Sequence, residues 1–158
     1  MFKDYYEILG INHNATSQQV KSAYRNMSKK WHPDINPDLD VTSIMQDINE
    51  AYAILKDEDK RKKYDVEYLN FKELFAKTPS FSNAQKDKSS DNYEVRDESL
   101  KEDIDKAREY ARKLVEDFMI AFRFSTKQAA EGAWGGVKAY IVGGIIASIV
   151  SALIRMCN

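Results

Sequence analysis

Cysteine and histidine, which often bind metals in proteins, are scarce in this sequence. The 158 residues include one cysteine, Cys157, and two histidines, His13 and His32. A single cysteine excludes both an intrachain disulfide and a cysteine-based zinc site. Charge of one sign is not in excess either, since 24 Lys and Arg residues stand against 25 Asp and Glu residues. We therefore expect no cofactor, no metal and no nucleic-acid partner.

The motifs of common enzyme classes are also missing. The sequence has no glycine-rich phosphate loop, no nucleophile elbow and no His-Glu-x-x-His motif. His32 has no cysteine or serine next to it. The N-terminus, which reads "MFKDYYEILG", lacks the apolar core of a secretory signal. These absences favour recognition over catalysis, and they favour a domain that stays in the cytoplasm.

Two helices are expected at the start of the chain. Residues 4–10 suit a short helix that closes at Gly10. A second helix begins at Thr16, which can form a capping box with Gln19, and ends near His32, because the residue before a proline is disfavoured in a helix. Apolar residues at helical spacing mark the buried face of this second helix, namely Val20, Ala23, Tyr24, Met27 and Trp31.

Two further helices follow. Asp40 can cap the start of the third helix. The charged stretch "KDEDKRKKYD" opens a fourth helix, which continues to about Ala76. The third helix has the clearest pattern in the chain, because its apolar residues follow the i, i+3, i+4, i+7 rule, namely Val41, Ile44, Met45, Ile48, Ala51, Tyr52 and Leu55.

The loop between the second and third helices carries the sequence His32-Pro33-Asp34. Pro33 restricts the backbone and biases His32 towards an extended conformation. The loop therefore presents an imidazole and a carboxylate in a set arrangement, with a basic helix face behind them. Such a preorganised, charged tip loses little entropy on binding and suits docking to another protein.

These residues resemble the J-domain of DnaJ-like co-chaperones. The resemblance covers residues 3 to about 68 and rests on "DYYEILGI", "VKSAYRNMSKKWHPDINPD" and "INEAYAILKDEDKRKKYD". It implies a small four-helix domain in which the second and third helices form an antiparallel hairpin. It also implies a function, which is to bind a DnaK-type heat-shock chaperone and stimulate its ATP hydrolysis. The chain itself would then be no enzyme.

The resemblance also implies a set of chaperone-binding residues. The loop contributes the essential triplet of the family, and the second helix contributes its basic face and one tyrosine. Ile35 departs from the family pattern, in which a basic residue is common at that position, and this loss of charge is expected to alter the choice of chaperone. The complete set is His32, Pro33, Asp34, Lys21, Tyr24, Arg25 and Lys29.

Beyond the fourth helix, residues 77–96 are polar and rich in serine and read as a linker. Helical spacing returns over residues 97–131. Its apolar positions alternate by four and three, as in a coiled coil, which suggests a parallel homodimer. The alternative is an amphipathic helix that lies on its own domain or on a membrane. The positions concerned are Leu100, Ile104, Ala107, Ala111, Leu114, Phe118 and Ala121.

The C-terminal segment, residues 132–158, is predicted to anchor the chain in a membrane. Residues 132–154 carry one charge, Lys138, and are long enough to span a bilayer. Small residues recur at every fourth position, a pattern that lets helices approach closely in lipid. A buried soluble helix, or a hairpin inserted in one leaflet, remains the alternative for this segment.

We therefore expect an all-α chain with a J-domain over 1–76, a linker over 77–96, an amphipathic or coiled-coil helix over 97–131 and an anchor over 132–158. The expected function is that of a membrane-tethered co-chaperone that recruits a DnaK-type chaperone to a membrane site. The expected topology is a single-pass C-terminal anchor with the J-domain facing the cytoplasm, because basic residues are more frequent on the N-terminal side of the anchor. The alternative is a membrane scaffold whose J-like domain does not stimulate a chaperone.

Overall fold

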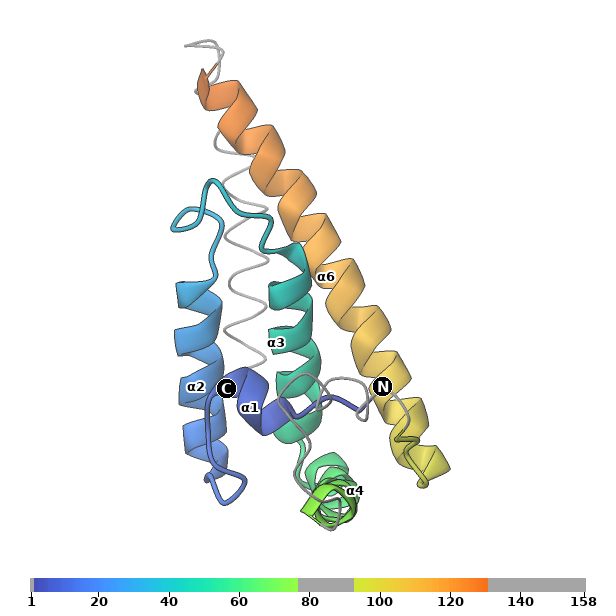
Figure 1. Cartoon of the computed structure of the whole chain (residues 1–158). Helices are drawn as coiled ribbons and strands as arrows, with labels where there is room; N and C mark the ends of the chain where they lie inside the picture. Colours follow the sequence, from blue (N-terminus) through green and yellow to red (C-terminus); the bar gives the residue numbers. More distant parts are fainter. Residues whose placement is uncertain (1, 77–92, 131–158) are drawn as a thin grey trace. The chain divides into compact units, whose positions relative to one another are not determined.

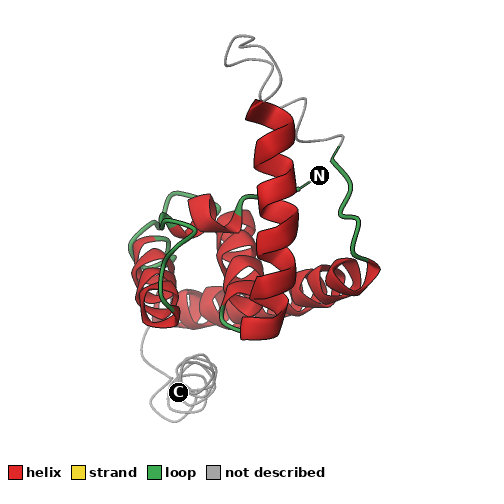
Figure 2. Cartoon of the chain, turned by 90° about the horizontal axis from the view of Figure 1, so that it is seen from below, coloured by secondary structure: helices red, strands yellow, loops and turns green. Residues whose placement is uncertain are grey.

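The protein is all-α in the computed structural model, which describes residues 2–76 and 93–130 (Figure 2). Five helices cover these residues: α1 (Tyr5–Leu9), α2 (Ser17–Lys30), α3 (Thr42–Leu55), α4 (Glu58–Ala76) and α6 (Glu98–Ala130) (Figure 1). The chain divides into two compact units, Met1–Ala111 and Arg112–Asn158. The all-α class expected from the sequence is thus confirmed over the described residues.

The ends of α1 and α2 follow the capping signals in the sequence. The Asp4 carboxylate accepts a hydrogen bond of 3.0 Å from the Glu7 N–H, and Gly10 closes α1 in the left-handed conformation with φ of 67°. At the start of α2, Thr16 and Gln19 form the predicted capping box with bonds of 3.2 and 2.8 Å. These local bonds set where both helices begin.

The start of α3 keeps the predicted contact from Asp40. The Asp40 carboxylate accepts a bond of 3.1 Å from the N–H of Thr42, the first residue of the helix, and so satisfies an N–H group that a helix start leaves without a partner. The N-cap position itself is Val41, one residue later, which is fully buried and offers no side-chain hydrogen bond.

Helices α2 and α3 lie side by side and are joined by the loop at one end, as in the expected antiparallel hairpin (Figure 1). Tyr24 of α2 stacks on Tyr52 of α3, with 4.0 Å between ring centroids. The Tyr24 hydroxyl donates a 2.9 Å hydrogen bond to Asn49 of α3. These contacts join the two helices to each other.

Helix α4 packs against the N-terminal segment through Tyr64, which is fully buried. Its hydroxyl donates to the Lys3 carbonyl at 2.8 Å and accepts from the Tyr5 N–H at 2.9 Å. Its ring stacks on those of Tyr5 and Phe2, with centroid distances of 4.7 and 5.4 Å. Tyr64 therefore joins α4 to the start of the chain through both polar and apolar contacts.

The first compact unit extends past residue 76, where the sequence placed the end of the J-domain. Tyr93, which was assigned to the linker, is 6% exposed. The first apolar positions of α6 are also buried within this unit, namely Leu100, Ile104, Ala107 and Ala111. This part of the helix lies on its own domain, which was the alternative to a coiled coil.

The predicted membrane segment, residues 132–154, lies outside the described residues. None of the helices that are described is long and apolar enough to cross a bilayer. The membrane helix and the homodimer therefore stay predictions.

Candidate functional site

The His32-Pro33-Asp34 loop begins where α2 ends. The N–H groups of Trp31 and His32 still donate to the helix, to the carbonyls of Met27 and Lys29 at 3.0 and 3.3 Å. The chain then turns back on itself, because the His32 carbonyl accepts from the Ile35 N–H at 3.0 Å. Pro33 is buried beneath this turn while Asp34 is exposed. The loop is thus a turn that a backbone hydrogen bond closes.

Inside the loop the imidazole and the carboxylate face each other. The Asp34 N–H donates to the His32 Nδ1 at 3.1 Å, and the Asp34 carboxylate lies 3.6 Å from the same nitrogen. A ring nitrogen that accepts this bond carries no hydrogen, so we assign the tautomer with its hydrogen on Nε2. The backbone N–H of Asp34 thereby orients the His32 ring.

Asn36 holds the loop closed, and the sequence analysis missed this residue. Its side-chain amide donates to the carbonyls of Lys30 and His32 at 2.8 and 2.9 Å. It therefore satisfies carbonyls at the C-terminal end of α2 and spans the triplet. The signal that could have identified it is an asparagine between two prolines, since asparagine commonly bonds to nearby backbone in turns.

The predicted basic face lies on α2. Lys21 is partly buried, while Arg25 and Lys29 are exposed. They follow one another at intervals of four residues and therefore share one side of the helix. The structure thus brings these three cations onto the helix that leads directly into the His32-Pro33-Asp34 loop.

Tyr24 occupies a different environment from the other predicted binding residues. It is 5% exposed and lies between α2 and α3, where it stacks on Tyr52 and bonds to Asn49. This position suits a role in holding the hairpin together. A direct contact between Tyr24 and a chaperone stays a prediction.

The exposed surface of α2 and the loop is suited to binding another protein. The exposed groups are cations on α2 and one imidazole–carboxylate pair at the loop. Among the described residues there is no group of His, Cys, Asp and Glu side chains that could hold a metal ion. The arrangement suits recognition of an acidic protein surface through charge complementarity.

Comparisons with known proteins match the same part of the chain. The DnaJ domain family matches residues 4–65. The chaperone protein DnaJ of Hydrogenobacter thermophilus is 51% identical over 63 residues, which are 40% of this chain and 18% of that protein. The corresponding protein of Geobacillus sp. is 52% identical over 63 residues, or 40% of this chain and 17% of that protein. The chain thus spans less than a fifth of the length of these relatives.

Solved structures are similar as well, among them the crystal structure of the J-Trx1 fragment of ERdj5. It is 40% identical, with a TM-score of 0.39, and the match covers 40% of this chain and 32% of that one. The family match begins at Asp4 and ends at Asp65, so it contains α1, α2, the loop, α3 and the first part of α4. Residues 4–65 of this chain thus match the DnaJ domain family.

Proposed function

We propose that this chain is a membrane-tethered J-domain co-chaperone that binds a DnaK-type heat-shock chaperone and stimulates its ATP hydrolysis. The observation that carries the proposal is the His32-Pro33-Asp34 loop, which is closed by Asn36 and follows directly from the basic side of α2. A loop that is already ordered loses little entropy when it docks. The chain acts on a partner ATPase and performs no chemistry of its own.

The test of this proposal is the ATP turnover of a DnaK-type chaperone with and without the full chain in detergent. The co-chaperone function requires faster turnover when the chain is present. The alternative, a membrane scaffold with a J-like domain, expects binding to membranes and no change in turnover. The intact triplet and the basic side of α2 favour the co-chaperone.

The basic side of α2 should govern how fast the two proteins meet. We expect Arg25→Glu to lower the association rate constant roughly tenfold at low salt, because reversing a charge at an interface removes electrostatic steering. Raised salt should slow the wild-type chain in the same way, since ions screen exposed charges. The measurement is stopped-flow or surface-plasmon kinetics across a salt series.

Arg112→Glu provides the matched control, because it makes the same charge reversal at an exposed position of α6. It should leave the association rate close to that of the wild type. Association that does not depend on salt, or equal effects of the two substitutions, would remove Lys21, Arg25 and Lys29 from the interface.

The C-terminal segment should determine where the protein is found. We expect truncation after Glu131 to release a soluble protein that still stimulates ATP turnover, because the truncation removes the 23-residue stretch with a single charge. The full chain should resist alkaline carbonate extraction. Protease added to the cytoplasmic face should digest its J-domain, as the distribution of basic residues predicts.

Recovery of the full chain in the soluble fraction without detergent would contradict the anchor. It would favour a packed soluble helix for residues 132–154 instead. Protection of the J-domain from protease on the cytoplasmic face would contradict the topology and leave the anchor in place.

A further inference from the structure

Glu67 is a buried acid two residues past the part of the chain that matches the DnaJ domain, and residues 93–97 supply its hydrogen bonds. It lies on α4 and is 3% exposed. The Tyr93 hydroxyl donates to one carboxylate oxygen at 2.6 Å, and the N–H groups of Arg96 and Asp97 donate to the other at 3.1 and 3.3 Å. A buried carboxylate needs such partners, because burial without them is strongly unfavourable. The buried carboxylate on α4 therefore depends on residues 93–97 for its hydrogen bonds.

Tyr93 is the aromatic anchor of the contact. Its ring meets those of Phe2 and Phe71 edge to face, with centroid distances of 5.3 Å in both cases. Burial, followed by the hydrogen bond to Glu67, raises the pKa of Tyr93 to about 12. Its hydroxyl therefore remains protonated and able to donate at neutral pH.

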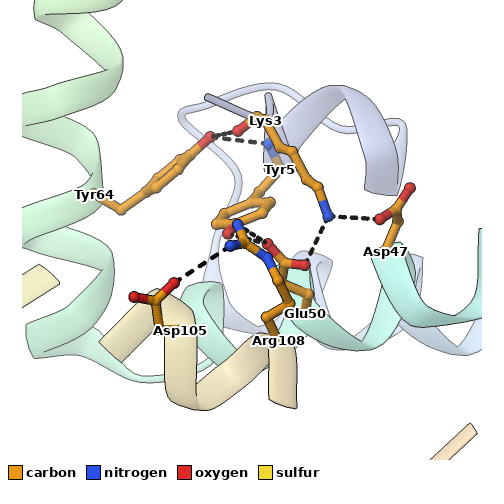
Figure 3. Close-up of polar contacts among 7 residues, drawn as sticks. All are labelled: Lys3, Tyr5, Asp47, Glu50, Tyr64, Asp105 and Arg108. Carbon is orange, nitrogen blue, oxygen red and sulfur yellow. Dashed lines mark hydrogen bonds and ion pairs between the residues drawn. The ribbon is translucent and has the colours of Figure 1, made fainter. Parts of the chain in front are cut away.

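A second buried acid, Glu50 of α3, takes one of its partners from α6 (Figure 3). It is 1% exposed and accepts bonds of 2.7 Å from both the Tyr5 hydroxyl and the Lys3 ammonium group. Arg108 of α6 lies 3.4 Å from the same carboxylate and is held by Asp105 at 3.3 Å. Burial by itself would lower the pKa of Lys3, but its bonds to Asp47 and Glu50 outweigh burial and raise it.

Apolar and charged contacts continue along α6. Ile104 is 7% exposed and lies beside Phe2 and Tyr5 around a small cavity of about 180 Å³. Asp103 pairs with Lys60 and Lys63 of α4 at 3.4 and 3.5 Å. The start of α6 is itself capped by Asp97, which accepts from the N–H groups of Ser99 and Leu100 at 2.8 and 3.0 Å.

We propose that this J-domain has a second protein-binding surface, formed by α1, α3 and α4 and built around Glu50 and Glu67, whose partner is residues 93–111 of its own chain. This docking segment binds as a separable unit, an amphipathic helix preceded by an aromatic anchor. Residues 77–92 tether it and keep its effective concentration high. The bound segment occupies the surface and so denies it to other proteins, while the basic side of α2 belongs to a different helix.

The test cuts the tether in the full chain. A protease recognition sequence is placed within residues 77–92, the purified protein is cleaved in mild detergent, and the two fragments are examined by size-exclusion chromatography. We expect the fragments to elute together after cleavage. The proposal requires no chaperone activity, so this result is independent of the proposed function.

Two substitutions at isoleucines of α6 make the experiment specific. Ile104→Asp places a charge in the contact, where Ile104 is 7% exposed, and should make the cleaved fragments separate. Ile120→Asp makes the same change at a residue that is 69% exposed and should leave them together. Both changes lie outside the DnaJ domain, so that domain should fold in either variant.

Three outcomes would overturn the proposal. The fragments of the unsubstituted chain could separate on cleavage, which would show that the segment does not bind by itself. The Ile104→Asp fragments could remain together, which would place the attachment elsewhere. The Ile120→Asp fragments could separate as readily as those of Ile104→Asp, which would show sensitivity to any charge on α6.

Discussion

His32→Gln should abolish the stimulation of chaperone ATP turnover while the chain remains folded. The imidazole lies in a loop outside the core, and its Nδ1 accepts the Asp34 N–H at 3.1 Å. Glutamine removes the ring and its orientation beside Asp34 but buries no new polar group. Substitutions at such sites usually change stability by no more than about 0.5 kcal/mol. The measurement is steady-state ATP turnover beside thermal unfolding of the same preparation.

The other histidine supplies the matched control. His13 is exposed in the loop between α1 and α2, so His13→Gln makes the same chemical change at a distance in sequence from the triplet. It should stimulate as the wild type does. Full stimulation by His32→Gln would refute the co-chaperone function, whereas loss of stimulation by both variants would point to a general effect on folding.

Features that depend on neighbours in the sequence could be predicted well. The capping box at Thr16 and Gln19 and the left-handed Gly10 follow from local chemistry, and both occur as expected. The α2–α3 hairpin follows from two apolar faces and the proline-containing loop between them. The His32-Pro33-Asp34 loop could be recognised because its residues lie together in sequence.

Features that depend on distant residues could not be predicted. Glu67 looks like one of many surface acids in a charged helix, yet Tyr93, Arg96 and Asp97 make it a buried one. No local pattern links residues separated by a polar linker. Apolar residues spaced by four and three fit a coiled coil and a helix on its own domain equally well, so the pattern of α6 could not decide between them.

Tyr64→Ala should cause a large loss of stability in the part of the chain that matches the DnaJ domain family. Tyr64 is fully buried and stacks on Tyr5 and Phe2. Removing a large buried aromatic side chain costs about 3–5 kcal/mol, which is a large part of the roughly 5–15 kcal/mol that stabilises a typical domain. Such a loss should lower the melting temperature by about 12 °C or more in a domain of this size. Thermal unfolding followed by far-ultraviolet circular dichroism measures the effect.

Two further variants separate the causes of this loss. Tyr64→Phe keeps the ring but leaves the Lys3 carbonyl and the Tyr5 N–H without their bonds to the hydroxyl. It should cost about 1–3 kcal/mol, the usual cost of a buried polar group left without a partner. Tyr110→Ala removes a tyrosine that is 45% exposed and should cost much less. If Tyr64→Ala melts no lower than Tyr110→Ala, then α4 does not pack against the N-terminal segment, and the surface that includes Glu67 loses its support.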